Sequence, residues 1–220
     1  MAAAGSTARR RTRARRGEGD KLRTEILAAA ERLLAQTSDE SAVSVRAVAD
    51  AVGVTAPSIY LHFADKNELL VAECERNFDE LSFEVERAAS RAADPAEVLR
   101  LAMMAYARFG LEHPEQYRIL FMRKAAPETE EAEHERLRNS SGFNFVLAAV
   151  VECMEAGLMR RGDPFLAAVA LWSVVHGITS LLISKPAFPW PPLEQFLDYT
   201  VRAHLDGVRP RAGDTFRDIP

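Results

Sequence analysis

The sequence contains little cysteine, which excludes several classes of small protein. Cys74 and Cys153 are the only cysteines among 220 residues, and they lie far apart. Two distant cysteines supply neither a disulfide framework nor a cysteine-rich metal site. We therefore expect two reduced, buried thiols and no metal or cofactor.

The sequence also has no uninterrupted apolar run long enough to cross a membrane. Its longest apolar stretch, residues 165–183, is broken by polar residues and a glycine at 173, 176, 177, 179 and 180, whereas a span needs about 20 apolar residues. The start of the chain is alanine-rich but turns to arginine, which does not resemble a signal peptide. We expect a cytoplasmic, nucleoid-associated protein without a membrane partner, in which residues 165–183 form a buried helix.

Aromatic residues are few, at 8% of the chain, and alanine is abundant. This composition favours helices over sheet, so the predicted fold class is all-α. The sequence lacks the Gly-x-Ser-x-Gly, phosphate-loop, His-Glu-x-x-His and dinucleotide motifs. An enzyme with a helical core is thus the weakest of the functions considered, and we expect no enzymatic activity.

Charge is divided unevenly along the chain. Residues 1–66 contain 11 basic and 8 acidic residues, a balance of +3, whereas the remainder carries −7 and the total is −4. Positive charge gathered at one end is typical of a protein of which only one part meets a polyanion.

The pattern of apolar residues and breaks predicts four regions. Residues 1–19 form an arginine-rich, disordered arm; 20–66 a three-helix domain; 67–208 a helical bundle; and 209–220 a flexible tail. Helices in the larger region are expected at roughly 66–91, 95–112, 115–124, 130–157, 163–184 and 192–207.

Within residues 44–63, two short helices are predicted on either side of a glycine turn. Ser44 is a good N-cap for the first, and Gly53 accepts the left-handed conformation at its end. Thr55 is expected to cap the second helix, with Pro57 in its first turn. Helices this short need a longer helix to cover them, and residues 20–36 carry a suitable apolar stripe. The arrangement is a helix-turn-helix.

Residues 44–70, SVRAVADAVGVTAPSIYLHFADKNELL, resemble the tetracycline-repressor-like (TetR/AcrR-type) family of transcription regulators. The family pattern has a capping Ser or Thr, an Ile/Val-Ala pair, Ala-x-Gly-Val, Tyr-x-His-Phe and Lys-x-x-Leu, all present here in order. The resemblance implies an N-terminal helix-turn-helix domain, followed by a helical bundle for dimerisation and ligand binding.

The resemblance also implies which residues meet double-stranded DNA. Four residues with suitable donors occupy positions that contact DNA phosphates in the family: Thr55, Tyr60, His62 and Lys66. Phosphate contacts fix the position of the protein along the DNA without recognising the base sequence. Arg46 matches a position from which a side chain reaches a base edge, where arginine can grip guanine. The capping Ser44 belongs to the same surface, and Ala56, Pro57 and Ser58 face the bases.

Simpler interpretations of these residues stay open. His62 could cap a helix C-terminus, Tyr60 could be a half-buried packing residue, and Lys66 could be a solvated lysine. The arm holds six arginines between residues 9 and 16. It could follow the minor groove, or it could be a solubilising tail.

Large apolar residues in the C-terminal region suggest a pocket for a small apolar effector, because methionine and aromatic rings adapt to varied apolar ligands. The alternative is that they only fill the core. The candidates are Met103, Met104, Phe109, Phe121, Met122, Phe143, Met154, Trp172 and His176.

Trp172, His176 and Gly177 resemble the signature of the Trp-His-Gly (WHG) subgroup of this family. The i, i+4 spacing places Trp172 and His176 on one helix face, and Gly177 would permit close helix approach. A histidine in such a helix is either a hydrogen-bonded core residue or a ligand contact.

By the same resemblance, the last two helices pair with those of a second copy to form a homodimer. Its reading helices would lie about 34 Å apart and recognise a palindromic operator. The main interpretation is a repressor released by the effector. The alternative is an activator or DNA-organising protein of the same fold without small-molecule control. The acidic residues between 128 and 135 are interpreted as a solvated face rather than a metal site.

Overall fold

The computed structural model describes residues 18–37, 43–122, 135 and 137–210, in which every regular element is a helix. Contacts between Cα atoms divide the chain into two compact units, residues 1–76 and 77–220. Each unit is described by itself. The predicted all-α class is confirmed for the described part of the chain.

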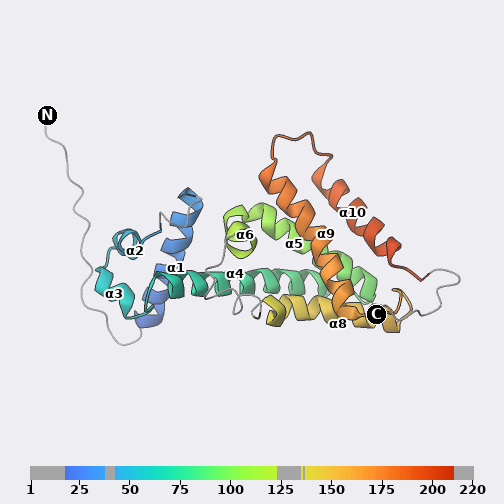
Figure 1. Cartoon of the computed structure of the whole chain (residues 1–220), viewed down its shortest axis with the longest axis horizontal. Coiled ribbons are helices and arrows are strands. Elements are labelled where there is room, and N and C mark those ends of the chain that lie inside the picture. Colours follow the sequence, from blue (N-terminus) through green and yellow to red (C-terminus); the bar gives the residue numbers. More distant parts are fainter. Residues whose placement is uncertain (1–17, 38–42, 123–134, 136, 211–220) are drawn as a thin grey trace. The chain divides into compact units, whose positions relative to one another are not determined.

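Unit 1 is a small helical domain. It comprises α1 (Glu18–Thr37), α2 (Val45–Val52), α3 (Ala56–Tyr60) and the beginning of α4 (Lys66–Ala89) (Figure 1). α1 packs against α2, and α2 against α3. The apolar sides of these helices meet in a core in which Ile26, Val48, Ile59 and Phe63 are almost completely buried.

Two of the predicted helix caps in unit 1 are confirmed. The Ser44 hydroxyl accepts the N–H of Ala47 at 3.1 Å, which satisfies one of the free donors at the start of α2. Gly53 ends the helix with φ 78°, and its N–H donates to the carbonyls of Ala49 and Asp50. The tight turn between α2 and α3 is therefore encoded locally.

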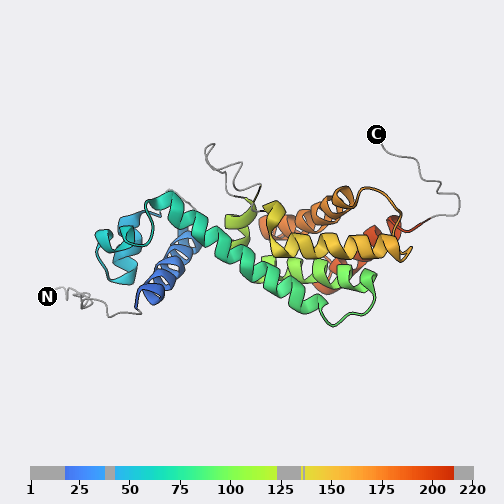
Figure 2. The same cartoon turned by 90° about the horizontal axis from the view of Figure 1, so that it is seen from below.

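Unit 2 is a helical bundle built around α5 (Pro95–Glu112). This helix packs against α6 (Pro114–Phe121), α8 (Ser141–Glu155), α9 (Pro164–Ser184) and α10 (Leu193–Gly207). Figure 2 shows α5, α8 and α9 side by side, and Figure 1 shows α9 and α10 running in opposite directions as a hairpin. The core is formed mainly by aliphatic and methionine side chains from these helices and from α4.

One predicted helix is wrong in its extent. Residues 130–157 were expected to form one helix, but α8 begins only at Ser141, and Ser140 is its N-cap with extended backbone. The hydroxyl of Ser140 accepts the N–H of Phe143 at 3.3 Å. Serine competes with the helix for its own backbone groups, and here that preference ends one helical segment and starts the next.

Two smaller boundaries also differ from the prediction. α1 begins at Glu18, so the last residues of the predicted arm are helical, and α3 ends at Tyr60 rather than near Phe63. Residues 1–17 and 211–220, and most of the acidic segment near residue 130, lie outside the described residues.

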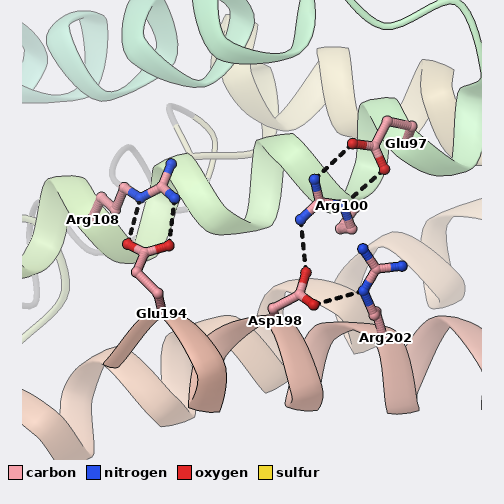
Figure 3. A network of polar contacts seen from close by, with 6 residues as sticks. All are labelled: Glu97, Arg100, Arg108, Glu194, Asp198 and Arg202. Atoms are coloured by element: carbon pink, nitrogen blue, oxygen red, sulfur yellow. Dashed lines mark hydrogen bonds and ion pairs between the residues drawn. The ribbon is translucent and has the colours of Figure 1, made fainter. Parts of the chain in front are cut away.

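Ion pairs join α10 to α5 along one side of the bundle (Figure 3). Arg108 holds both carboxylate oxygens of Glu194, at 3.0 and 2.6 Å. Arg100 donates to Asp198 at 2.7 Å and holds both oxygens of Glu97 on its own helix. Paired arginine N–H groups give such contacts a defined geometry, so they set the position of α10 along α5.

Hydrogen bonds to arginine lower the pKa of the carboxylates in this network. The pKa of Glu97 falls because Arg100 donates to it, and that of Glu194 because Arg108 donates to it. For Asp198 the larger contribution comes from Arg202, whose Nε lies 2.6 Å away. All three groups stay charged at neutral pH.

α9 is long and apolar enough to cross a membrane, with a mean hydropathy of 2.0 in its most apolar stretch. Within the bundle it is packed against α5, α8 and α10, yet only 33% of that stretch is buried. The prediction of a buried helix is thus met on one side only, and the chain leaves Leu166 and Leu181 about half exposed.

Candidate functional site

The outer surface of α2 and α3 collects the side chains predicted to meet DNA. Arg46 is exposed in the first turn of α2, and Pro57 is exposed in the first turn of α3. Tyr60 is 54% exposed and Leu61 83% exposed, although Ile59 beside them is completely buried. The helix pair therefore buries its apolar side and presents the predicted reading surface to solvent.

The N-terminus of α3 departs from the predicted capping. Thr55 occupies the N-cap position with extended backbone, but its side chain makes no cap hydrogen bond. Its hydroxyl instead lies 2.9 Å from that of Ser58. Both hydroxyls lie at the N-terminus of α3, next to the half-buried Ala56. A phosphate or a base edge there could replace the hydrogen bond between them.

The last two predicted contacts lie around the start of α4. Lys66 is its first residue and is half-buried, as is His62 before it. Asp65 caps the helix, since its carboxylate accepts the N–H of Glu68 at 2.8 Å, and Glu68 in turn accepts the N–H of Ala64. This reciprocal capping fixes the backbone that carries Lys66.

Unit 2 contains a second candidate site, an apolar cavity of about 70 Å³. Its wall is formed by α4, α5, α6, α8 and α9, together with the segment just before α8. An adjoining groove of about 470 Å³ shares three wall residues with the cavity and is also lined by Arg138. The shared residues are Leu137, Phe143 and Trp172.

Only some of the nine residues predicted to bind a ligand line this cavity. Met103, Phe121, Phe143 and Trp172 line the cavity. His176 packs against two of these, with ring centroids 5.4 Å from Phe121 and 5.7 Å from Trp172. The others do not line this cavity: Met104, Phe109 and Met154 are buried in the core, and Met122 is 40% exposed.

One wall of the cavity was missed from the sequence. Phe78, Leu81, Ser82 and Val85 of α4 all line it. Their spacing of three or four residues places them on one helix face, a signal that the sequence contains. This spacing does not by itself predict a cavity wall, because it is typical of any helix that faces the core.

Beside the cavity, four polar side chains form a connected cluster. Trp172 Nε1 donates to the Tyr106 hydroxyl at 3.1 Å, and that hydroxyl lies 3.4 Å from Tyr117. The Tyr117 hydroxyl lies 2.6 Å from His176 Nδ1, and the rings of Tyr117 and His176 are stacked. The predicted Trp-His pair thus takes part in a hydrogen-bonded cluster within the core.

Burial keeps the members of this cluster uncharged. It raises the pKa of Tyr106 well above its ordinary value and that of Tyr117 to about 12. Burial also lowers the pKa of His176. At neutral pH, the cluster therefore consists of two phenols, a neutral imidazole and an indole.

Glycine allows the helices beneath the cluster to approach closely, but at Gly110 rather than at the predicted Gly177. A Cβ atom on Gly110 would lie 2.5 Å from Thr179 Cγ2 and 2.7 Å from Tyr117 Cδ2. At Gly177, nothing in the described chain lies within 4 Å of such an atom. A close approach at Gly177 would have to come from another molecule.

Neither cysteine belongs to a site. Both are buried, and burial raises the pKa of the Cys153 thiol to about 11, which keeps it protonated and unreactive. In the described part of the chain, no group of three or more potential ligands could hold a metal ion.

Two family comparisons cover most of the chain. Residues 26–72 match the family described as "Bacterial regulatory proteins, tetR family". Residues 99–204 match "Tetracyclin repressor-like, C-terminal domain". The first match contains α2, α3 and their exposed surface, and the second contains most of the residues around the cavity.

Individual proteins are also similar to this chain. The HTH-type transcriptional activator FasR of Mycolicibacterium smegmatis is 34% identical over 103 residues, which is 46% of either chain, so the match spans about half the length of that curated relative. MexZ of Pseudomonas aeruginosa, a repressor responsible for antibiotic resistance, is 28% identical, with a TM-score of 0.67 over 87% of this chain and 96% of its own. Bacillus subtilis FadR in complex with stearoyl-CoA is 18% identical and shares the fold, with a TM-score of 0.72 over 84% of this chain and 99% of its own.

Proposed function

Since the chain belongs to the tetracycline-repressor-like family of bacterial regulatory proteins, we propose that it acts as a homodimer that binds a palindromic operator and releases it when a small apolar effector binds. The family consists of DNA-binding transcription regulators rather than enzymes, and its members are soluble cytoplasmic dimers. Nucleoid association and the Trp-His-Gly subgroup stay predictions.

One observation carries this proposal: the helix-turn-helix exposes the residues that DNA binding needs. Tyr60 and Pro57 are solvent-exposed while Ile59 between them is fully buried. Tyr60 and the neighbouring Leu61 are both exposed, and exposed apolar residues that lie together are typical of surfaces that meet a partner. The hydroxyls of Thr55 and Tyr60, with Lys66, supply donors for phosphate.

Base recognition is proposed to come mainly from Arg46. The first turn of α3 offers Ala56 and Pro57, whose side chains can touch a thymine methyl but donate no hydrogen bond, and Ser58, which can. Arg46 is exposed in α2 and can donate two hydrogen bonds to guanine. Ser44 holds the backbone from which Arg46 projects.

The experiment is to obtain the operator by genome-wide binding-site sequencing and then measure affinity by fluorescence anisotropy. Arg46→Ala should lose about 1–3 kcal/mol on the best operator, and should lose preference at one base pair of each half-site. Arg91→Ala, which removes an exposed arginine of unit 2, is the matched control and should bind unchanged. Equal base preference in Arg46→Ala and the unaltered protein would refute this assignment.

Dimerisation is proposed to use the exposed apolar side of α9 and α10. Leu166, Leu181 and Tyr199 lie on these helices and are 54%, 52% and 73% exposed. Gly177 lies between the two leucines with open space around it. A helix as apolar as α9 needs cover on several sides, and a second copy supplies that cover in an isologous dimer.

Effector control is supported by the apolar cavity in unit 2. Its coupling to DNA must be reciprocal, so operator DNA should weaken effector binding by the factor by which the effector weakens operator binding. The FadR neighbour binds stearoyl-CoA, which supports an effector with a large apolar part. Identical effector affinity with and without operator would refute the coupling.

An activator is the second candidate, because the FasR relative is named as one. The two candidates differ in the transcript level of the neighbouring genes after deletion of the regulator. Transcription rises if the protein represses and falls if it activates. Either result is compatible with control by an effector, which the cavity favours over a regulator without one.

A further inference from the structure

The cavity in unit 2 has a wall without charge. Its sixteen lining residues are apolar except for two serines, Tyr106, Trp172 and a glycine, and none of them carries a formal charge. A buried carboxylate or ammonium group without a partner costs several kcal/mol. The part of an effector that enters this cavity must therefore be neutral.

The two serines of the wall hold the start of α8. Ser140 Oγ donates to the carbonyl of Leu137 at 2.9 Å and accepts the N–H of Phe143. Ser82 Oγ accepts the N–H of Gly142 at 3.1 Å, and a Cβ atom on that glycine would lie 2.8 Å from the same oxygen. Both hydroxyls are thus committed to closing one side of the cavity.

The Tyr106 hydroxyl has only distant acceptors for its own proton. The oxygen receives the indole N–H of Trp172 at 3.1 Å. The acceptors for its own proton are the Tyr117 oxygen at 3.4 Å and His176 Nδ1 at 3.2 Å. The first distance exceeds the roughly 2.5–3.0 Å usual between two oxygens, and the second lies at the long end of the roughly 2.7–3.2 Å range between nitrogen and oxygen.

The better acceptor, His176 Nδ1, is already taken. Tyr117 lies 2.6 Å from that nitrogen, much closer than Tyr106 does. If Nδ1 is unprotonated, it accepts from Tyr117, whose hydroxyl also lies 3.2 Å from the His176 carbonyl oxygen; if Nδ1 is protonated, it donates to Tyr117, and Tyr117 donates to that carbonyl. In either tautomer the Tyr106 proton is left with a long, weak hydrogen bond.

Tyr106 itself belongs to the wall of the cavity. Tyr106 and Trp172 both line it, and a hydrogen bond joins the polar ends of these two side chains. Phe121, a third wall residue, packs against both Tyr106 and Trp172. Burial raises the pKa of Tyr106, so the hydroxyl keeps its proton at neutral pH.

We propose that Tyr106 is the hydrogen-bond donor that selects the effector, and that the effector is a neutral, apolar compound with a carbonyl oxygen, as in a ketone or an ester, placed at this hydroxyl. The inference depends on the proposed role of the cavity as the effector site. Trp172 and His176 act as positioning residues. Trp172 orients the hydroxyl through its N–H, and His176 engages Tyr117 so that the Tyr106 proton stays available.

The cavity is small, and its volume limits how much of a probe molecule can lie inside it. Its volume of about 70 Å³ is less than half of the ~150 Å³ of an engineered cavity that holds benzene. A larger effector would continue past Phe143 and Trp172 into the adjoining groove, which is lined by apolar residues and by the oppositely charged Glu135 and Arg138. The carbonyl end of such an effector belongs in the cavity and the rest in the groove.

The test compares two probes of the same shape, 2-hexanone and 2-methyl-1-hexene, in which a methylene group replaces the carbonyl oxygen. Each is too large for the cavity alone, so the carbonyl end is expected in the cavity and the alkyl chain in the adjoining groove. Affinities are measured by isothermal titration calorimetry on the full-length dimer and on Tyr106→Phe. The variant should lose roughly three- to tenfold in affinity for the ketone, the range expected for one hydrogen bond. Its affinity for the alkene should stay the same within twofold.

Ser82→Ala is the matched control, because it removes one of the two serine hydroxyls of the wall and leaves Tyr106 in place. It should shift both affinities by the same factor. Trp172→Phe removes the N–H that orients Tyr106 and should reduce the ketone-to-alkene ratio, which a purely structural role would leave unchanged. A ratio that is equal in Tyr106→Phe and the unaltered protein, or that is lost in Ser82→Ala instead, would overturn the proposal.

The outcome is separate from that of the proposed function. Ketone selectivity is measured without DNA, whereas operator release is measured by anisotropy with the same ketone. Selective binding without operator release would support Tyr106 as a donor and refute effector control by this site. Operator release that is insensitive to Tyr106→Phe would retain effector control and refute the role of Tyr106.

Discussion

Gly110 decides how closely three helices of unit 2 can pack. The position lies in α5, and a methyl group there would meet Thr179 of α9 and Tyr117 of α6 within 2.7 Å. Tyr117 is completely buried and contacts His176. The absence of a side chain at Gly110 therefore allows the close packing that places the polar cluster next to the cavity.

We expect Gly110→Ala to destabilise the protein, even though alanine is the better helix former by about 1 kcal/mol. Overpacking of a dense core costs about 1–3 kcal/mol, so a lower free energy of unfolding should appear in urea denaturation followed by circular dichroism. Thr179→Ser removes the nearest methyl group and should recover part of the loss in the double variant. Strict additivity of the two substitutions would show that the contact is absent.

At the scale of elements, two arginines of α5 set the position of α10, and these two side chains differ in how exposed they are. The Arg100 side chain is 19% exposed and lies between Glu97 and Asp198, whereas that of Arg108 is 45% exposed and bonds to Glu194 alone. Exposed ion pairs contribute about 0–1 kcal/mol. Removing one partner of a more buried network costs more, because it leaves a charge unpaired.

We therefore predict that Arg100→Ala destabilises the α5–α10 contact more than Arg108→Ala does. Amide hydrogen exchange of residues 193–207 should increase in Arg100→Ala and change little in Arg108→Ala. Added salt should diminish the effect of Arg108→Ala further, because solvent ions screen that pair. The assignment is contradicted if both variants speed exchange in α10 equally.

At the scale of the whole molecule, the α9–α10 hairpin exposes several large apolar side chains. Leu166 and Leu181 on α9, with Phe188 after it and Leu193 on α10, are all exposed. Exposed apolar patches are typical of protein interfaces. Members of the tetracycline-repressor-like family act as dimers, and we propose that a second copy covers this surface.

Leu181→Glu should convert the dimer to a monomer at micromolar concentration, as measured by sedimentation velocity. An isologous interface receives the new charge twice, once from each copy, so one substitution has a double effect. Phe83→Glu is the control, because Phe83 is a similarly exposed apolar residue of α4, at 63%. A dimer that survives Leu181→Glu but not Phe83→Glu would place the interface elsewhere.

Much of this protein follows from local sequence signals. Ser44, Gly53 and Asp65 set helix ends through their own short-range hydrogen bonds and backbone preferences, so α2, the turn and the start of α4 could be predicted. The break at Ser140 was missed because the Glu- and Arg-rich residues before it and the apolar residues after it both favour a helix. At Ser140, the tendency of serine to cap a new helix competes with the tendency of the preceding helix to continue. The local sequence pattern does not determine which of the two is stronger.

The sequence by itself determined the helical class, the helix-turn-helix and the side chains that this domain exposes, because these depend on residues only a few positions apart. Only the tertiary structure decided which large apolar residues surround a cavity and which merely fill the core. It also brought Tyr106, Tyr117 and His176 from three different helices to one point. Contacts between residues 59 and 70 positions apart depend on how the helices pack, and a helical periodicity identifies the buried face of each helix but not the neighbour that it will meet.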